Sequence, residues 1–135
     1  MKNKNNIFNL FIFTNSPGEL STWVTSIVKN FKNLEPDSKI TVMLTPCPYA
    51  SGNEPQVAKA IWGVDKVLSP KETKKNILSF PWFKNAAING AVLFLGGDPM
   101  FSRLFSKKHK MPCYAYTEHK QNPGKFFKKV FYKHI

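Results

Sequence analysis

Residues 7–34, IFNLFIFTNSPGELSTWVTSIVKNFKNL, place an apolar run, a short turn and a helical pattern directly one after another. The run Ile7–Thr14 is mostly apolar and alternates only weakly, which predicts a strand buried on both faces. Over Leu20–Leu34 the apolar residues recur at spacings of three and four, which predicts an amphipathic helix. The turn holds Ser16-x-x-Glu19, a capping-box spacing, with proline at the first helical position. A buried strand that leads at once into a helix is the repeating unit of an α/β sheet.

The same alternation continues along the chain. Further strands are predicted at residues 39–45, 64–68, 90–95 and 112–117, and further helices at 54–62, 70–78 and 99–108. Strands that alternate with helices predict a Rossmann-like α/β fold, with a mostly parallel sheet and helices on both faces. The length of 135 residues fits one domain that spans residues 1–135.

Clusters of polar residues and glycine follow four of the predicted strands. Ligands of parallel sheets bind beyond the carboxyl ends of the strands, so these clusters are the candidate functional site. The candidate substrate-binding residues in them are Ser16, Gly18, Glu19, Ser51, Gly52, Glu54, Gly96, Gly97 and Glu118.

Each cluster also has a purely structural interpretation. The turn at residues 15–19 offers free backbone N–H groups to an anion or a sugar hydroxyl, but Glu19 also suits a helix cap. Asp98 could act as a general base toward a hydroxyl nucleophile, or simply cap the helix that begins at Pro99. The long loop 45–54 suits either binding or a rigid proline turn. None of these turns carries the dinucleotide fingerprint GxGxxG or a P-loop, so neither dinucleotide nor ATP binding is supported.

The net charge of +12 is concentrated near the end of the chain, because residues 103–135 carry nine Lys and Arg against one Glu. Such a tail indicates an anionic partner: nucleic acid, acidic lipid headgroups or a phosphorylated substrate. Residues 125–134 predict a basic amphipathic helix, which would lie on an anionic membrane or pack against the rest of a larger protein. The absence of alternating aromatic and basic residues on exposed strands disfavours RNA.

No apolar run approaches the ~18 residues that span a bilayer, and no secretory signal is recognised. We therefore expect a cytoplasmic protein, either free or peripheral at the inner face of the cytoplasmic membrane. Cys47 and Cys113 are expected to be reduced, and catalysis by either is disfavoured. The three histidines form no recognisable metal-ligand set, so neither a metal nor another cofactor is expected.

Three segments together resemble one family. The stretches TNSPGELSTWV (residues 14–24), LTPCPYASGNE (44–54) and VLFLGGDPMF (92–101) resemble proteins related to lipid-A-disaccharide synthase, a bilobal glycosyltransferase family. The resemblance implies the N-terminal, acceptor-side lobe of a two-lobed GT-B enzyme. That family transfers a sugar from a UDP-sugar donor to a lipid-linked sugar acceptor, with inversion at the anomeric carbon and no metal.

By the same resemblance, Asp98 is the catalytic base, and Gly18 and Glu19 form the family's glycine-glutamate turn. The UDP-sugar would be bound mainly by a C-terminal lobe that these residues do not include, supplied by a missing segment or an adjacent gene. Lipid-A-disaccharide synthases continue the turn with a Ser-Gly-Asp type of sequence, whereas here Leu20-Ser21 follows. This departure implies a related branch with a different acceptor. The alternatives are a basic binding module without catalysis, or a truncated remnant.

Overall fold

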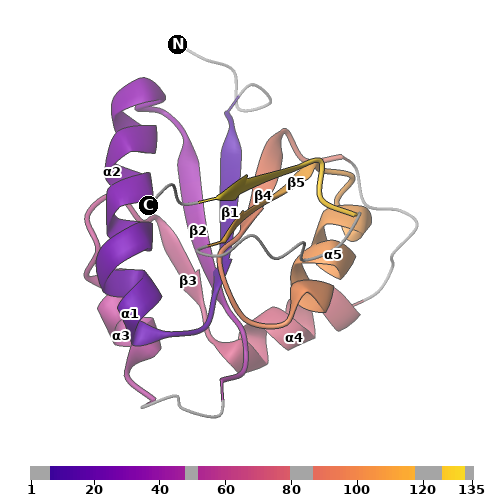
Figure 1. Cartoon of the computed structure of the whole chain (residues 1–135), viewed down its shortest axis with the longest axis horizontal. Coiled ribbons are helices and arrows are strands. Elements are labelled where there is room, and N and C mark those ends of the chain that lie inside the picture. The colour runs from indigo at the N-terminus through magenta and orange to yellow at the C-terminus, as the bar shows by residue number, and fades with distance from the viewer. Residues whose placement is uncertain (1–6, 48–51, 80–86, 118–125, 133–135) are drawn as a thin grey trace.

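The computed structural model describes residues 7–47, 52–79, 87–117 and 126–132 (Figure 1). Six strands form one parallel sheet in the order β3-β2-β1-β4-β5-β6. Their bounds are β1 Asn9–Thr14, β2 Lys39–Leu44, β3 Lys66–Leu68, β4 Gly90–Phe94, β5 Cys113–Thr117 and β6 Lys129–Tyr132. The strand order is that of the doubly wound dinucleotide-binding folds, so the Rossmann-like prediction is confirmed.

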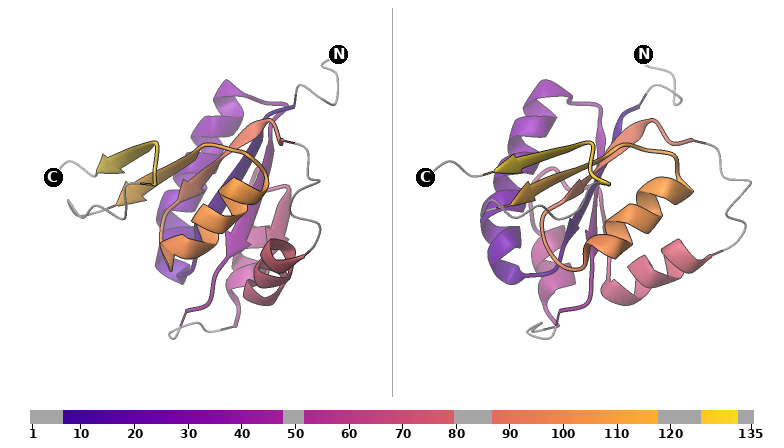
Figure 2. Two further views of the ribbon diagram at one scale, coloured as in Figure 1. Left: turned by 90° about the vertical axis from the view of Figure 1, so that its right-hand side faces the viewer. Right: turned by 45° about the vertical axis from the view of Figure 1, so that its right-hand side comes forward.

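Helices cover both faces of the sheet, as predicted (Figure 2). Their bounds are α1 Pro17–Glu19, η2 Leu20–Val24, α2 Thr25–Leu34, α3 Glu54–Lys59, α4 Pro70–Leu78 and α5 Pro99–Lys108. On one face, Leu20, Val24 and Val28 pack with Ala58 of α3 against the sheet. On the other face, Ile77 of α4 and Phe105 of α5 pack against it.

The strands supply side chains to both layers, which explains their apolar runs. In β1, Leu10 and Ile12 belong to the first cluster, while Phe13 belongs to the second. In β2, Val42 and Met43 divide in the same way. A strand covered on both faces has no solvent side, and this is why its sequence does not alternate cleanly between apolar and polar residues.

The first helix contains a turn that its sequence period does not reveal. Residues 17–34 form one helical segment, as predicted, but η2 within it has the wider π-type turn. Threonine hydroxyls bond to backbone carbonyls around it: Thr22 to Gly18 O at 2.6 Å, and Thr25 to Leu20 O at 2.9 Å. Wide turns of this kind occur mostly as single insertions, frequently at functional sites.

The prediction of a basic amphipathic helix over residues 125–134 is wrong for the described part of that range. Residues 129–132 form β6, which pairs in parallel with β5 through Ala115 and Val130. Phe127, just before β6, is buried against Phe94 with ring centroids 5.5 Å apart. Aromatic and β-branched residues favour strands, and here the neighbouring strand β5 was available to pair. Binding of this segment to an anionic membrane was predicted from an amphipathic helix, and the described residues do not form that helix.

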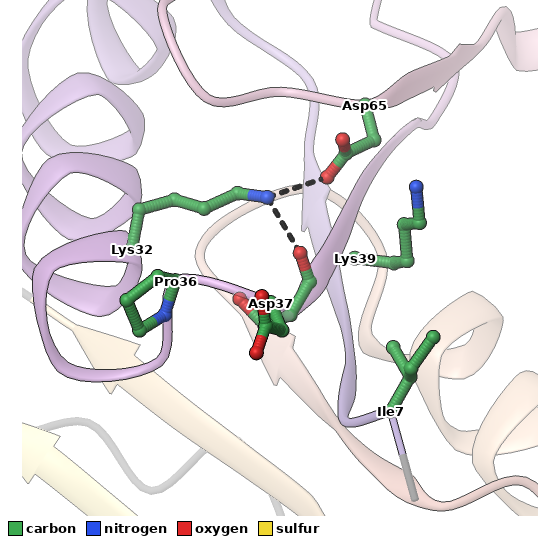
Figure 3. A pocket seen from close by; sticks show the side chains of 7 residues that line it. Ile7, Lys32, Pro36, Asp37, Lys39 and Asp65 are labelled. Carbon is green, nitrogen blue, oxygen red and sulfur yellow. Dashed lines mark hydrogen bonds and ion pairs between the residues drawn. The ribbon is translucent and has the colours of Figure 1, made fainter. Parts of the chain in front are cut away.

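At the amino ends of the strands, a pocket of about 500 Å³ holds a structural ion pair (Figure 3). Lys32 Nζ lies 2.9 Å from Asp65 Oδ2 and donates a hydrogen bond to the backbone oxygen of Ser38. The same Asp65 oxygen accepts from the backbone N–H of Ile40 at 2.8 Å. This pocket lies at the opposite edge from the candidate site and ties α2 to β2 and the start of β3.

Partial burial acts to raise the pKa of Asp65, but the bonds from Ile40 and Lys32 outweigh it and lower that pKa below its usual 3.8. The folded state therefore gains stability above that value and loses it as the pH falls through the lowered pKa. We expect Asp65→Asn to cost about 1 kcal/mol near neutral pH, and nothing once the pH is below the lowered pKa. Urea unfolding of both proteins across this range checks this, and a gap that is independent of pH would contradict it.

No helix among the described residues is long and apolar enough to cross a membrane.

Candidate functional site

The site lies where the chain direction across the sheet reverses. From β1 the chain runs outward through β2 to β3, and then returns to β4 on the other side of β1. The carboxyl ends of β1 and β4 are therefore neighbours with helix connections leading away on opposite faces. In parallel sheets this is where ligands bind. The turns Asn15–Glu19 and Gly96–Asp98 meet at this position.

Glu19 crosses from one turn to the other. Its carboxylate accepts a 2.6 Å hydrogen bond from the hydroxyl of Thr14, the last residue of β1. It also lies directly against Gly96, where a Cβ would overlap both carboxylate oxygens. A side chain at position 96 would have to push this carboxylate aside, so the position of Glu19 depends on Gly96.

The predicted capping box at Ser16 and Glu19 is only half formed. The Ser16 hydroxyl accepts from the Glu19 backbone N–H at 3.3 Å, but the Glu19 side chain turns inward to Thr14. By contrast, Ser69 and Glu72 at the start of α4 form the complete reciprocal pair. The same sequence spacing thus gives two different structures. At the first helix the Glu19 side chain binds Thr14 and does not take part in the cap.

We expect Gly96→Ala to destabilise the protein by about 1 kcal/mol, because the new methyl group displaces the end of the Glu19 side chain and breaks its hydrogen bond to Thr14. In a Glu19→Ala background the same change should cost far less, since the overlapping group is gone. A double-mutant cycle of urea unfolding measures this coupling. Equal costs in the two backgrounds would show that Gly96 and Glu19 do not act together.

Gly97 makes the second close approach of the site. Its φ of +94° lies in the region that favours glycine, and a Cβ there would overlap the hydroxyl of Thr45. Thr45, one residue beyond β2, is 2% exposed, and its Oγ1 has no hydrogen-bond partner. A buried hydroxyl without a partner lowers the stability of the folded state by about 1–3 kcal/mol. The Thr45 hydroxyl can therefore still form hydrogen bonds with a ligand.

Asp98 is exposed at the start of α5. Its Oδ1 accepts from the backbone N–H of Met100 at 2.9 Å, so the helix-capping interpretation is observed. A single cap bond leaves a carboxylate with further acceptor capacity. The structure therefore places Asp98 beside the glycine turn as a helix cap, and its role as a base stays a prediction.

Next to these turns lies a pocket of about 250 Å³ between the end of β2 and the starts of α3 and α4. Glu54 is 5% exposed in it, and its Oε2 accepts from the backbone N–H of Gly52 at 3.0 Å. The lining residues are Asn15, Leu44, Thr45, Gly52, Glu54, Pro55, Ser69 and Pro70. The pocket and the glycine turn share Thr45, which lines the pocket and touches Gly97.

The predicted site residues divide into two neighbouring groups. Glu19, Gly96, Gly97 and Asp98 meet at the ends of β1 and β4, while Gly52 and Glu54 line the pocket. Ser16 caps the helix, and Gly18 has open space around the position of a Cβ. Ser51 and Glu118 lie outside the described residues.

The candidate residues named from the sequence did not include Thr14, Asn15 or Thr45, although the clusters at residues 15–19 and 45–54 contain the last two. Each stands at or just beyond the end of an apolar strand, and polar residues at that point were the signal available in the sequence. Thr14 holds Glu19, and Asn15 and Thr45 line the pocket.

The two cysteines and the possible metal ligands of the described residues lie as follows. Cys47 and Cys113 are both free thiols. Burial raises the pKa of Cys113 to about 12, so at neutral pH this thiol is not a nucleophile. No group of three or more His, Cys, Asp or Glu side chains suited to a metal ion occurs among the described residues.

Comparison with known proteins adds no relative: no family model, curated protein or solved structure matches this chain.

Proposed function

We propose that this chain is the acceptor-side lobe of a hexosyltransferase-type glycosyltransferase with GT-B architecture. It would take part in the transfer of a sugar from a UDP-sugar to a hydroxyl of a lipid-linked or other glycan acceptor. The observation that supports this best is the contact of the Glu19 carboxylate with the Gly96-Gly97-Asp98 turn at the point where strand order reverses. Family resemblance in those same two turns adds to the proposal.

In this proposal Asp98 acts as the general base. An acceptor hydroxyl donates its proton to the exposed carboxylate of Asp98 while its oxygen attacks the anomeric carbon of the donor. The bond from that carbon to the UDP oxygen breaks, and UDP leaves with the electron pair, so the anomeric configuration inverts. A positioned base of this kind contributes about 10²–10⁴-fold to the rate.

Glu19 would orient the acceptor rather than take its proton. The Thr14 hydroxyl fixes one oxygen of its carboxylate. A carboxylate can accept about four hydrogen bonds in all, so it can still accept one from a sugar hydroxyl. The two glycines leave room for the Glu19 carboxylate and the Thr45 hydroxyl, which lie where their side chains would be.

The donor would be held mainly by a second lobe. The turns at residues 15–19 and 96–98 carry neither the dinucleotide fingerprint nor a P-loop. The described residues that line the pocket include no lysine or arginine to bind a diphosphate. We therefore propose that a nucleotide-binding lobe, in the same polypeptide or a partner, completes the enzyme.

The test uses the tagged chain isolated from its native cells, so that any nucleotide-binding lobe is retained; this sample is called the native preparation. UDP release from UDP-hexoses is measured with and without glycan acceptors. UDP release that requires an acceptor supports the proposal. No UDP release with any donor, or the same rate of release with and without an acceptor, would contradict it.

A second candidate is a basic binding module, and one surface favours it. Arg103 and Lys107 of α5 lie over the ring of Phe126, at 5.5 and 5.9 Å, and Lys129 lies 5.0 Å from the ring of Phe131. Cations beside aromatic rings also occur where proteins bind single-stranded nucleic acid. Binding of a single-stranded oligonucleotide that falls steeply as salt is raised would favour this module.

A further inference from the structure

We propose that the pocket lined by Asn15, Thr45 and Glu54 binds one uncharged, hydroxyl-bearing ring, a single hexose unit without phosphate. This rests on the proposed function insofar as the ring belongs to the acceptor, but the binding itself can be tested without any transfer reaction. Nothing in the family resemblance specifies such a subsite.

The first support is the unsatisfied hydroxyl of Thr45. It is buried at the boundary of the pocket and the Gly97 turn and has no hydrogen-bond partner. A buried polar group without a partner is rare in folded proteins, and a bound water or ion is one of its ordinary explanations. At Thr45 the adjoining pocket gives a ligand the same opportunity. Oγ1 has almost no exposed surface, so the proposal requires Gly97, which packs against this hydroxyl, to move aside when a ligand hydroxyl binds.

The second support is the charge of the lining. Among the described residues that line it, the only ionisable side chain is the carboxylate of Glu54, and none is a lysine, arginine or histidine. A carboxylate accepts hydrogen bonds from ligand hydroxyls and repels phosphate and carboxylate groups. The Asn15 amide and the Ser69 hydroxyl provide both donors and acceptors, which match a sugar hydroxyl in either role. The lining thus selects hydroxyl groups against anions.

The third support is size and shape. A volume of about 250 Å³ lies below the ~300–1,000 Å³ of pockets for drug-sized ligands, so it suits one ring and not two. Leu44, Pro55 and Pro70 give part of the lining an apolar surface. The C–H face of a pyranose can pack there while its hydroxyls meet the polar side chains.

The experiment titrates the purified chain with methyl hexopyranosides and with hexose 1-phosphates, and follows backbone amide signals by NMR. We expect at least one neutral glycoside to shift the amides of Asn15, Thr45 and Gly97, with a dissociation constant on the order of 1 mM, typical of a weak single-ring ligand at about −4 kcal/mol. The phosphorylated sugars should bind at least tenfold more weakly.

Thr45→Val removes the hydroxyl and keeps the shape of the side chain. It should weaken glycoside binding about five- to tenfold, as expected for one lost hydrogen bond. It should also raise the Tm by about 4–8 °C, because an unsatisfied buried hydroxyl is removed. Thr73→Val is the matched control: Thr73 is also buried with an unpartnered hydroxyl, but it does not line the pocket. It should raise the Tm similarly and leave glycoside binding unchanged.

The outcomes separate this proposal from the proposed function. No shift with any neutral glycoside, tighter binding of the phosphates, or equal binding by wild type and Thr45→Val would overturn the sugar pocket. These results leave the UDP-release test of the native preparation to decide transfer. Conversely, glycoside binding at these residues with no transfer activity would keep the pocket and overturn the enzyme.

Discussion

Gly90→Ala is expected to destabilise the protein by about 3 kcal/mol or more, the upper range for a substitution that forces backbone to move. Gly90 opens β4 and pairs with Asn9 of β1. A Cβ at this position would overlap the backbone carbonyl oxygen of Asn9, which cannot swing away as the end of a side chain can. The two central strands must separate at their amino ends to admit it.

A thermal melt measures this as a fall in Tm of about 10 °C or more, at about 3–4 °C for each kcal/mol in a domain of 135 residues. Gly18→Ala is the matched control, because a Cβ there meets nothing within 4 Å and the residue lies in the first helical turn. The control should be neutral or slightly stabilising. Equal effects of the two substitutions would refute the close approach of β1 and β4 at Gly90.

Asp98→Asn is expected to reduce the turnover of the native preparation by about 10²–10⁴-fold, the usual contribution of a general base. The amide of asparagine cannot take the proton of an acceptor hydroxyl. Asparagine is nevertheless as good an N-cap as aspartate, so the bond to the Met100 N–H survives and stability should change by less than about 0.5 kcal/mol. The pair of measurements thus separates catalysis from capping at one position.

The expected pattern for Asp98→Asn is lost turnover with an unchanged KM for the donor and an unchanged Tm. Asp98→Ala provides the comparison, since it removes both roles and should lower the Tm as well as the rate. Full turnover in Asp98→Asn would leave Asp98 as a helix cap only, and the base would have to be sought elsewhere in the site.

Most of the fold could be predicted from the sequence, because each central strand is buried on both faces. Phe11, Ile12 and Phe13 fall in one apolar run, and the helix that follows shows a clear period. Pairing partners and strand order are not written in that pattern, however. Residues 126–132 illustrate this, because their apolar spacing suits a helix. In the structure residues 129–132 pair with β5 as a strand instead, and Phe127 packs against Phe94.

The candidate site could be located from the sequence but not assembled. The rule that ligands bind at the carboxyl ends of parallel strands identified the turns around Glu19, Gly96 and Glu54. The inward turn of Glu19 could not be foreseen, because Ser16 and Glu19 have the same spacing as the capping pair Ser69 and Glu72. Whether a carboxylate caps its own helix or reaches a neighbouring strand depends on what packs opposite, and here that is Gly96.

The central claim is that this chain is the acceptor side of a sugar transferase, and transfer of label tests it most directly. The native preparation is supplied with UDP-hexoses labelled in the sugar and with a lipid and glycan extract of the same cells. Products are separated and identified by mass spectrometry. The account predicts one acceptor that gains a single labelled hexose, at a rate that Asp98→Asn lowers at least 100-fold. The account would be contradicted if, with every donor, the label were found only in unreacted UDP-hexose or in free hexose formed by hydrolysis.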